Sequence, residues 1–114
     1  MRTYGIYKAL KKHKMIYFTQ LIYINEVEEQ VFDEFEAVVI PAILKYNGRL
    51  LLRIRPDENS FIEHSIEKPY EIHFGGFDTE QHFEKFLRDK DRKKFLHLKE
   101  QSVKTSVLIQ GTKL

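Results

Sequence analysis

The stretch PAILKYNGRLLLRIR, residues 41–55, joins a helix to a strand. Apolar side chains recur at steps of three and four from position 28 to position 46, which predicts an amphipathic helix. Asn47 and Gly48 are typical of a helix end. In the residues that follow, leucine and isoleucine alternate with arginine, so we expect a strand over 49–55 with one basic side.

The segments on either side complete a pattern of strands and helices. A run rich in β-branched and aromatic residues comes first, and it is apolar on both alternating sides, as in a central strand covered on both faces. The expected strands are 16–24, 49–55, 70–77 and 103–110, and the expected helices are 28–46 and 78–100, the latter interrupted at 89–91. The order β-α-β-β-α-β predicts an α+β, ferredoxin-like fold: a four-stranded antiparallel sheet with the helices on one face and the first and third strands in the centre.

The other face of this sheet has nothing within one chain to cover it. Tyr17, Leu21, Tyr23 and the residues that alternate with them cannot all face helices, so one apolar surface would stay in water. Burial of such surface is worth roughly 25 cal/mol per Å². A homodimer that stacks two open faces with twofold symmetry removes the exposure. We therefore expect a dimeric α/β barrel whose partner is a second copy of the chain.

Composition excludes several kinds of protein. The 114 residues suffice for one domain, and 42% hydrophobic with 32% charged residues is typical of a globular chain. The lack of cysteine excludes disulfide scaffolds, thiolate zinc sites, iron–sulfur clusters and cysteine nucleophiles. No apolar run approaches the roughly 18 residues of a membrane span. A net charge of +2 is too small to indicate nucleic acid as a partner.

Positive charge is concentrated in residues 1–14, which hold five of the 19 basic residues and no acid, whereas residues 15–114 hold all 17 acids. We divide the chain there into a basic N-terminal arm and a domain. Three interpretations of the arm stay open: an extension upstream of a true start at Met15, a flexible solubilising arm, or an arm that contacts nucleic acid or an anionic surface. The arm lacks the apolar run of a secretory signal, so we expect a cytoplasmic protein.

The stretch from Pro41 to Arg53 resembles the P-x-x-x-x-Y-G-G-R-x-x-x-R pattern of a bacterial family of uncharacterised small proteins. FDTE at 77–80 and DKDRKKF at 89–95 are similar to the F-P-S-x-E and S-P-E-Y-Q stretches of that family, and the likeness covers residues 15–113. The family belongs to the dimeric α/β-barrel superfamily. The superfamily also holds antibiotic-biosynthesis monooxygenases, NIPSNAP-type proteins and EthD-like proteins.

Three positions depart from the family pattern: Asn47 replaces the first glycine of its pair, the loop 56–69 is longer, and DKD at 89–91 replaces Ser-Pro-Glu. The resemblance implies a ferredoxin-like fold and a homodimer. It also implies a pocket between sheet and helices, where superfamily monooxygenases of the cofactor-free kind use polar side chains and no metal. We accordingly expect no cofactor. The close relatives have no agreed catalytic residues, so the resemblance assigns none here.

His73 is the leading catalytic candidate. It shares one alternating side of the third strand with Glu71, and Arg53 lies on the neighbouring second strand. An imidazole beside a carboxylate and a guanidinium can carry out acid–base chemistry on an oxyanion or an enol. The structural alternative is a buried histidine whose hydrogen bonds are satisfied by Glu71 or by a tyrosine hydroxyl.

Arginines and tyrosines supply the candidate ligand-binding residues beside Glu71. Arg49, Arg53 and Arg55 form a ladder that can hold a carboxylate or phosphate, with Arg53 best placed, although charges on an edge strand also prevent aggregation. Tyr17 and Tyr23 can line a pocket or serve as core aromatics. We expect no metal site, because no two histidines have the spacing of ligand pairs.

Two functions remain in view. The first is an enzyme that acts on a small organic molecule between sheet and helices, similar to the cofactor-free monooxygenases. The second is a non-catalytic dimeric module that binds a ligand or is associated with stress. A closed, polar cavity of about 300 Å³ or more that holds His73 and Arg53 favours an enzyme or a binder. A space filled by phenylalanine and tyrosine rings favours the module.

Overall fold

The computed structural model describes residues 15–114, so the basic arm 1–14, with the three interpretations offered for it, lies outside the described residues. The strands are β1 (Ile16–Ile24), β2 (Gly48–Ile54), β3 (Glu71–Phe77) and β4 (Val103–Gly111), and the helices are α2 (Glu29–Lys45), α3 (Glu80–Leu87), α4 (Lys90–Lys94) and α5 (Leu96–Ser102). Short 3₁₀ turns lie at Glu26–Glu28 and Glu58–Ser60. None of the helices in the described part of the chain has the length and hydropathy of a membrane-spanning segment.

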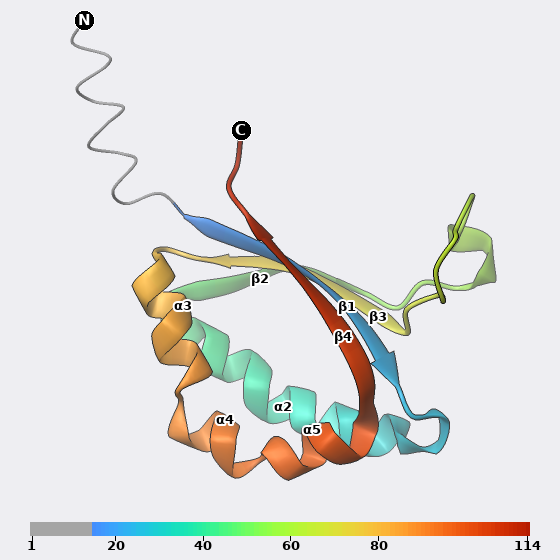
Figure 1. Ribbon diagram of the computed structural model, residues 1–114. Coiled ribbons are helices and arrows are strands. Elements are labelled where there is room, and N and C mark those ends of the chain that lie inside the picture. The colour runs from blue at the N-terminus through green and yellow to red at the C-terminus, as the bar shows by residue number, and fades with distance from the viewer. Residues whose placement is uncertain (1–14) are drawn as a thin grey trace, which may run out of the picture.

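The sheet is antiparallel throughout, in the order β2-β3-β1-β4. Figure 1 shows it as a curved layer with the helices gathered on one side. The predicted α+β, ferredoxin-like fold is therefore confirmed, with β1 and β3 in the centre and β2 and β4 at the edges. The second helical region divides into three short helices rather than two.

Helix α2 ends where the sequence predicts. Asn47 N donates a hydrogen bond to Leu44 O (3.2 Å), and Asn47 has a positive φ of 58°. That left-handed conformation suits glycine best, and asparagine tolerates it better than most residues with a side chain. Asn47 can therefore replace the glycine of the resembling family. Gly48 has less freedom, because a Cβ there would lie 2.6 Å from Phe77 Cε1.

Alternation along the central strands sorts the side chains onto two faces. His73 of β3, Gln20 of β1 and Leu108 of β4 lie in register across the sheet, and all three line a cavity under the helices. One step along β3, Phe74 pairs with Leu52 of β2 on the opposite face. The structure thus settles which alternating set meets the helical layer.

Aromatic rings hold the sheet and the helical layer together. Phe77 at the end of β3 is fully buried, and its ring centroid lies 5.3 Å from that of Phe83 and 5.2 Å from that of Phe86. Phe18 of β1 and Ile43 of α2 belong to the same core cluster. Four of these five side chains also form walls of the cavity described below.

A buried aspartate ties the C-terminal helices to the end of α2. Asp89 accepts hydrogen bonds from Tyr46 Oη (2.7 Å), from the backbone N of Arg92 (2.8 Å) and from Lys45 Nζ (3.2 Å). The hydrogen bond from Tyr46, with that from the Arg92 backbone, lowers the pKa of Asp89 to about 2. The side chain both caps α4 and anchors it to α2.

The second face of the sheet is apolar, and none of the helices within residues 15–114 covers it (Figure 1). Tyr17 stacks on Phe74 there, with ring centroids 5.6 Å apart. Several aliphatic side chains of this face remain 41–56% exposed in the single chain, among them Leu52, Ile54, Val107 and Ile109. The open apolar surface that the sequence predicts is therefore present.

Candidate acid–base site

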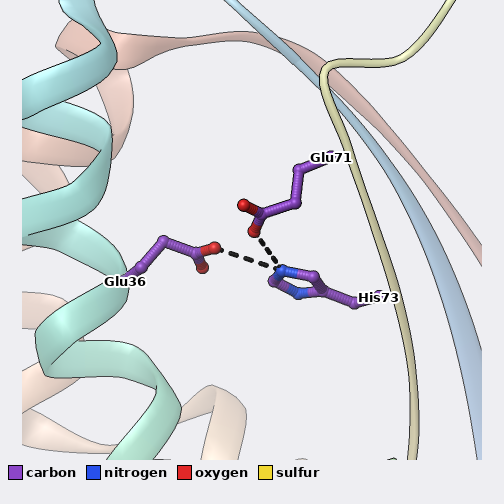
Figure 2. Close-up of side chains that lie close together, drawn as sticks. All are labelled: Glu36, Glu71 and His73. Carbon is purple, nitrogen blue, oxygen red and sulfur yellow. Dashed lines mark hydrogen bonds and ion pairs between the residues drawn. The ribbon is translucent and has the colours of Figure 1, made fainter. Parts of the chain in front are cut away.

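Strand β3 presents two ionisable side chains to the helix-covered side of the sheet. Glu71 and His73 are two residues apart, so both point the same way. Glu71 is 0% exposed and His73 is 4% exposed. His73 Nε2 donates a hydrogen bond to Glu71 Oε2. Figure 2 shows the carboxyl groups of Glu71, from the same strand, and of Glu36, from α2, both directed at one nitrogen of the imidazole.

Two arginines of the neighbouring strand β2 hold the Glu71 carboxylate. Arg55 Nε donates to Glu71 Oε1 (2.7 Å), and Arg53 Nε donates to Glu71 Oε2 (3.2 Å). Arg55 also donates to Asp33 Oδ1 of α2 (2.6 Å) and lies over the Tyr70 ring at 4.9 Å. Because charged donors engage both of its oxygens, Glu71 is an ionised carboxylate fixed in one position.

Glu36 of α2 approaches His73 from the helical layer. The residue is 4% exposed, and its Oε1 lies 3.1 Å from His73 Nε2 and 3.5 Å from Arg53 Nη2. The Nε2–H of His73 is directed to Glu71, so Glu36 Oε1 receives no well-aligned hydrogen bond from the described residues. A buried carboxylate oxygen without a donor is unfavourable as an anion. The geometry therefore favours a proton on Glu36.

The pKa values of the three groups separate their roles. Burial raises the pKa of Glu36 to about 7, although the nearby His73 imidazole opposes the shift. Burial alone would lower the pKa of His73, but the carboxyl groups of Glu36 and Glu71 beside its Nε2 raise it to about 9. Burial would likewise raise the pKa of Glu71, but the hydrogen bonds from His73, Arg53 and Arg55, together with the neighbouring Glu36 carboxyl, bring it well below its ordinary range. At neutral pH the cluster thus holds an imidazolium, a fixed anion and a carboxyl close to half protonation.

A cavity of about 260 Å³ lies between the sheet and the helices, with His73 and Glu36 in its wall. Most of the remaining wall is apolar, including Phe18, Phe32, Phe35, Phe83 and Phe86. Glu71 and Arg53 are not among its lining residues, so both sit behind His73. The cavity meets the sequence-based criterion for an enzyme or a binder only in part: it contains His73, but it is smaller than about 300 Å³, its wall is mostly apolar, and Arg53 is not in it.

The structure brings together only some of the residues singled out from the sequence. His73, Glu71 and Arg53 meet on one side of the sheet. Tyr17 and Tyr23 point to the opposite face, where Tyr17 stacks on a phenylalanine and the Tyr23 hydroxyl donates to a loop carbonyl oxygen (2.8 Å). A ligand-binding role for these two tyrosines stays a prediction, and it would concern a different surface from that of His73.

Sequence reasoning misses Glu36. On α2 this residue falls within the buried stripe that includes Phe32 and Phe35. A lone acid inside an apolar helical stripe is the signal that could find it, because such an acid is buried and needs either a partner or a proton.

The same cluster has the donor set of a metal site. Ligand atoms of Glu36, Glu71 and His73 all lie within 4.8 Å of one another. Both oxygens of Glu71, however, already accept hydrogen bonds from arginine, and two guanidinium charges at contact distance oppose a further cation. The arrangement fits a shared proton better than a metal ion.

No protein-family model and no curated protein matches the sequence. The fold is similar to that of the RPA0582 protein of unknown function from Rhodopseudomonas palustris, with a TM-score of 0.76 and 12% identity over 99% of this chain and 92% of that chain. A NIPSNAP family protein of unknown function from Agrobacterium tumefaciens aligns with a TM-score of 0.64 and 13% identity over 89% of each chain. A dimeric protein of unknown function with a ferredoxin-like fold from Bacteroides fragilis gives 0.62 and 10%, over 87% of this chain and 96% of that chain.

Identities this low establish a shared fold and no shared activity. The neighbours include a NIPSNAP family protein and a ferredoxin-like protein, as the sequence resemblance predicts. The chain thus has a ferredoxin-like fold.

Proposed function

We propose that this protein is an enzyme that moves a proton to or from a small organic molecule bound between the sheet and the helices. The observation that carries the proposal is the buried cluster at the cavity wall. There, two neighbouring carboxyl groups, Glu36 and Glu71, have pKa values displaced in opposite directions. Such a pair separates a proton-transfer group from a fixed charge. A structural histidine needs one acceptor, whereas His73 faces two carboxyl groups.

Glu36 is the general base in this proposal. Its pKa of about 7 lets it take a proton from a C–H or O–H group of the substrate near neutral pH. The negative charge that forms on the substrate is stabilised by the imidazolium of His73, which also lines the cavity. Glu71 touches no substrate. Together with Arg53 and Arg55 it is a positioning residue that orients the imidazole.

Proton abstraction is also the first step of a cofactor-free oxygenation. A CH₂ group that loses a proton becomes an electron-rich carbanion that O₂ can oxidise directly. One oxygen atom becomes the carbonyl oxygen of the product, and the other leaves with the two hydrogens as water, so that CH₂ + O₂ gives C=O + H₂O. This reaction is the monooxygenase-like activity that the sequence resemblance implies, with O₂ as the oxidant.

Hydrogen–deuterium exchange tests the proton transfer without knowledge of the natural substrate. A panel of small C–H acids, such as aryl ketones and 1,3-diketones, is incubated with the protein in D₂O, and loss of the C–H signal is followed by proton NMR. We expect accelerated exchange for at least one compound, and a loss of about 10²-fold or more in Glu36→Gln. Glu34→Gln, on the exposed side of the same helix, is the matched control and should exchange like wild type.

Two results would contradict the proposal. One is exchange by Glu36→Gln at the wild-type rate. The other is a panel in which no compound exchanges faster with the protein than in buffer.

We also propose that the working unit is a homodimer formed by the open sheet faces. The half-exposed aliphatic side chains of that face support it, because two stacked copies would remove them from water. The Bacteroides fragilis neighbour is itself described as dimeric. We expect a dimer mass in light scattering, and a monomer for Ile109→Lys. Val27→Lys, at a position that is 91% exposed but outside the sheet, should stay dimeric. A wild-type monomer would refute this part of the proposal.

The aromatic lining of the cavity favours one second function, a dimeric module that binds a small ligand without converting it. Both functions predict saturable binding that raises the melting temperature. Only the enzyme predicts hydrogen–deuterium exchange that depends on Glu36. A compound that binds tightly and exchanges no proton would favour the module.

A further inference from the structure

Two cations line the cavity that contains His73: Arg92 of α4 and Lys99 of α5. The guanidinium of Arg92 lies over the Phe86 ring at 5.4 Å, and its Nη1 donates to Leu87 O (3.1 Å). These contacts fix the guanidinium beside the cavity. They use one of its five N–H donors and leave the others for a ligand.

Within residues 15–114, no carboxylate forms an ion pair with either cation. Burial lowers the pKa of Lys99, and the charge of Arg92 lowers it further, so the two groups lie close enough to repel. Asp89 favours the charge of Arg92, but its carboxylate is already engaged by Tyr46, Lys45 and a backbone N–H. Two half-buried like charges oppose folding unless an anion compensates them.

Lys99 and the acid–base cluster lie next to different strands of the sheet. Lys99 is one helical turn before Val103, the first residue of β4, whereas His73 belongs to β3. Strand β1 separates β3 from β4, so the two strands are about 10 Å apart. The cavity wall between them is mostly apolar, with Gln20 and Ser106 as polar exceptions, and the volume of about 260 Å³ is just below the usual range for ligand sites. A molecule with one ring fits these dimensions.

We propose that the cavity takes a small aromatic carboxylate, with its carboxylate held by Arg92 and Lys99 and its ring against the phenylalanine side chains. A guanidinium and an ammonium together are suited to a carboxylate, and the ligand's charge relieves their repulsion. The opposite end of the ring then meets Glu36 and His73. This orientation rests on the proposed function, but the anion site itself does not.

Titration of the isotope-labelled full chain, followed by NMR, tests the anion site with phenylacetate as the probe. Phenylacetamide has nearly the same shape and no charge, so it is the matched ligand control. We expect saturable shifts at Lys99, Ser106 and the Arg92 side chain, with phenylacetamide at least about tenfold weaker. Lys99→Met should weaken phenylacetate about tenfold, and Lys93→Met, at an exposed position of α4, should not change it. Equal affinity for the two ligands, or no saturable phenylacetate binding up to about 10 mM, overturns the inference.

Thermal unfolding separates a ligand-binding role of Lys99 from a structural one. Lys99→Met removes a repulsion and no described ion pair, so we expect a ligand-free melting temperature equal to or above that of wild type. A lower melting temperature with unchanged phenylacetate affinity would overturn the inference.

The anion site and the proton transfer can fail separately. Phenylacetate binding that depends on Lys99, without exchange that depends on Glu36 for any compound, would keep the anion site and refute the proton transfer. Exchange that depends on Glu36 and proceeds at equal rates for anionic and neutral compounds would keep the proton transfer and refute the anion site.

Discussion

Replacing Glu36 by glutamine tests the electrostatics of the buried cluster in one step. Glutamine keeps the size of the side chain and removes the carboxylate whose Oε1 lies 3.1 Å from His73 Nε2. We take this contact of the carboxylate with the imidazolium to be worth as much as a hydrogen bond to a charged group, about 1.5–3 kcal/mol, and one pKa unit corresponds to about 1.4 kcal/mol. The loss should therefore lower the pKa of His73 by about one to two units. From a value of about 9, the variant should titrate between about 7 and 8.

The titration is followed through the Cε1–H resonances of the histidines in carbon-13 NMR spectra. The chain has five histidines, so the His73 signal is assigned by its absence in His73→Gln. Glu34→Gln, exposed on the same helix, should leave the His73 pKa at about 9. A value of about 9 in Glu36→Gln would show that Glu36 does not stabilise the imidazolium. An ordinary histidine pKa in the wild type would show that the cluster is not formed.

Three other predictions concern stability. Glu36 has a folded pKa of about 7 against 4.5 unfolded, and His73 about 9 against 6.5. The folded state therefore holds more protons, and stability measured by urea unfolding should fall as pH rises from about 4.5 to 9. A rise in stability over that range would contradict both pKa shifts. Gly75→Ala should destabilise by about 2 kcal/mol or more, since its Cβ would lie 2.4 Å from a backbone carbonyl oxygen, whereas Gly111→Ala should change stability by less than about 0.5 kcal/mol because nothing lies within 4 Å. Asp89→Asn should cost about 1–3 kcal/mol in the same assay, because a charged acceptor of three hydrogen bonds is lost, and should leave the His73 pKa in place.

The fold is largely predictable from the sequence because local and long-range signals agree. The run 16–24 is apolar on both alternating sides, and the structure places it at the centre of the sheet. Asn47 and Gly48 end α2 as the helix-stop pattern predicts, since the first takes a positive φ and the second has no room for a side chain. The register between β2 and β3 shifts near Leu51, and no local sequence pattern predicts this shift. The side chains of β2 therefore change their alternation between the two faces at that point.

The candidate site is predictable only in part. Alternation puts Glu71 and His73 on one side of β3, and antiparallel pairing brings Arg53 beside His73. Alternation does not say which side meets the helices, because β1 is apolar on both. The sequence could therefore not show that Tyr17 and Tyr23 lie on the opposite face of the sheet from His73.

The positions of Glu36 and Arg92 at the cavity could not be predicted from local sequence patterns, for different reasons. The contact between Glu36 and His73 joins a helix to a strand far along the chain, and no local pattern encodes that distance. Arg92 belongs to a run in which acids and bases alternate, which is typical of a solvated helix surface. The structure instead directs its guanidinium over Phe86 and to the cavity wall.

Strand β3 interleaves two surfaces with opposite properties. Glu71 and His73 point to the cavity side, while Ile72 and Phe74 between and beside them point to the open face. A single residue inserted into or deleted from this strand would exchange the two sets of side chains. Apolar side chains would then enter the charged cluster, and charged side chains would lie on the apolar face. A change of length that preserves both surfaces therefore has to fall outside β3, as it would in the loop 56–69 that precedes the strand.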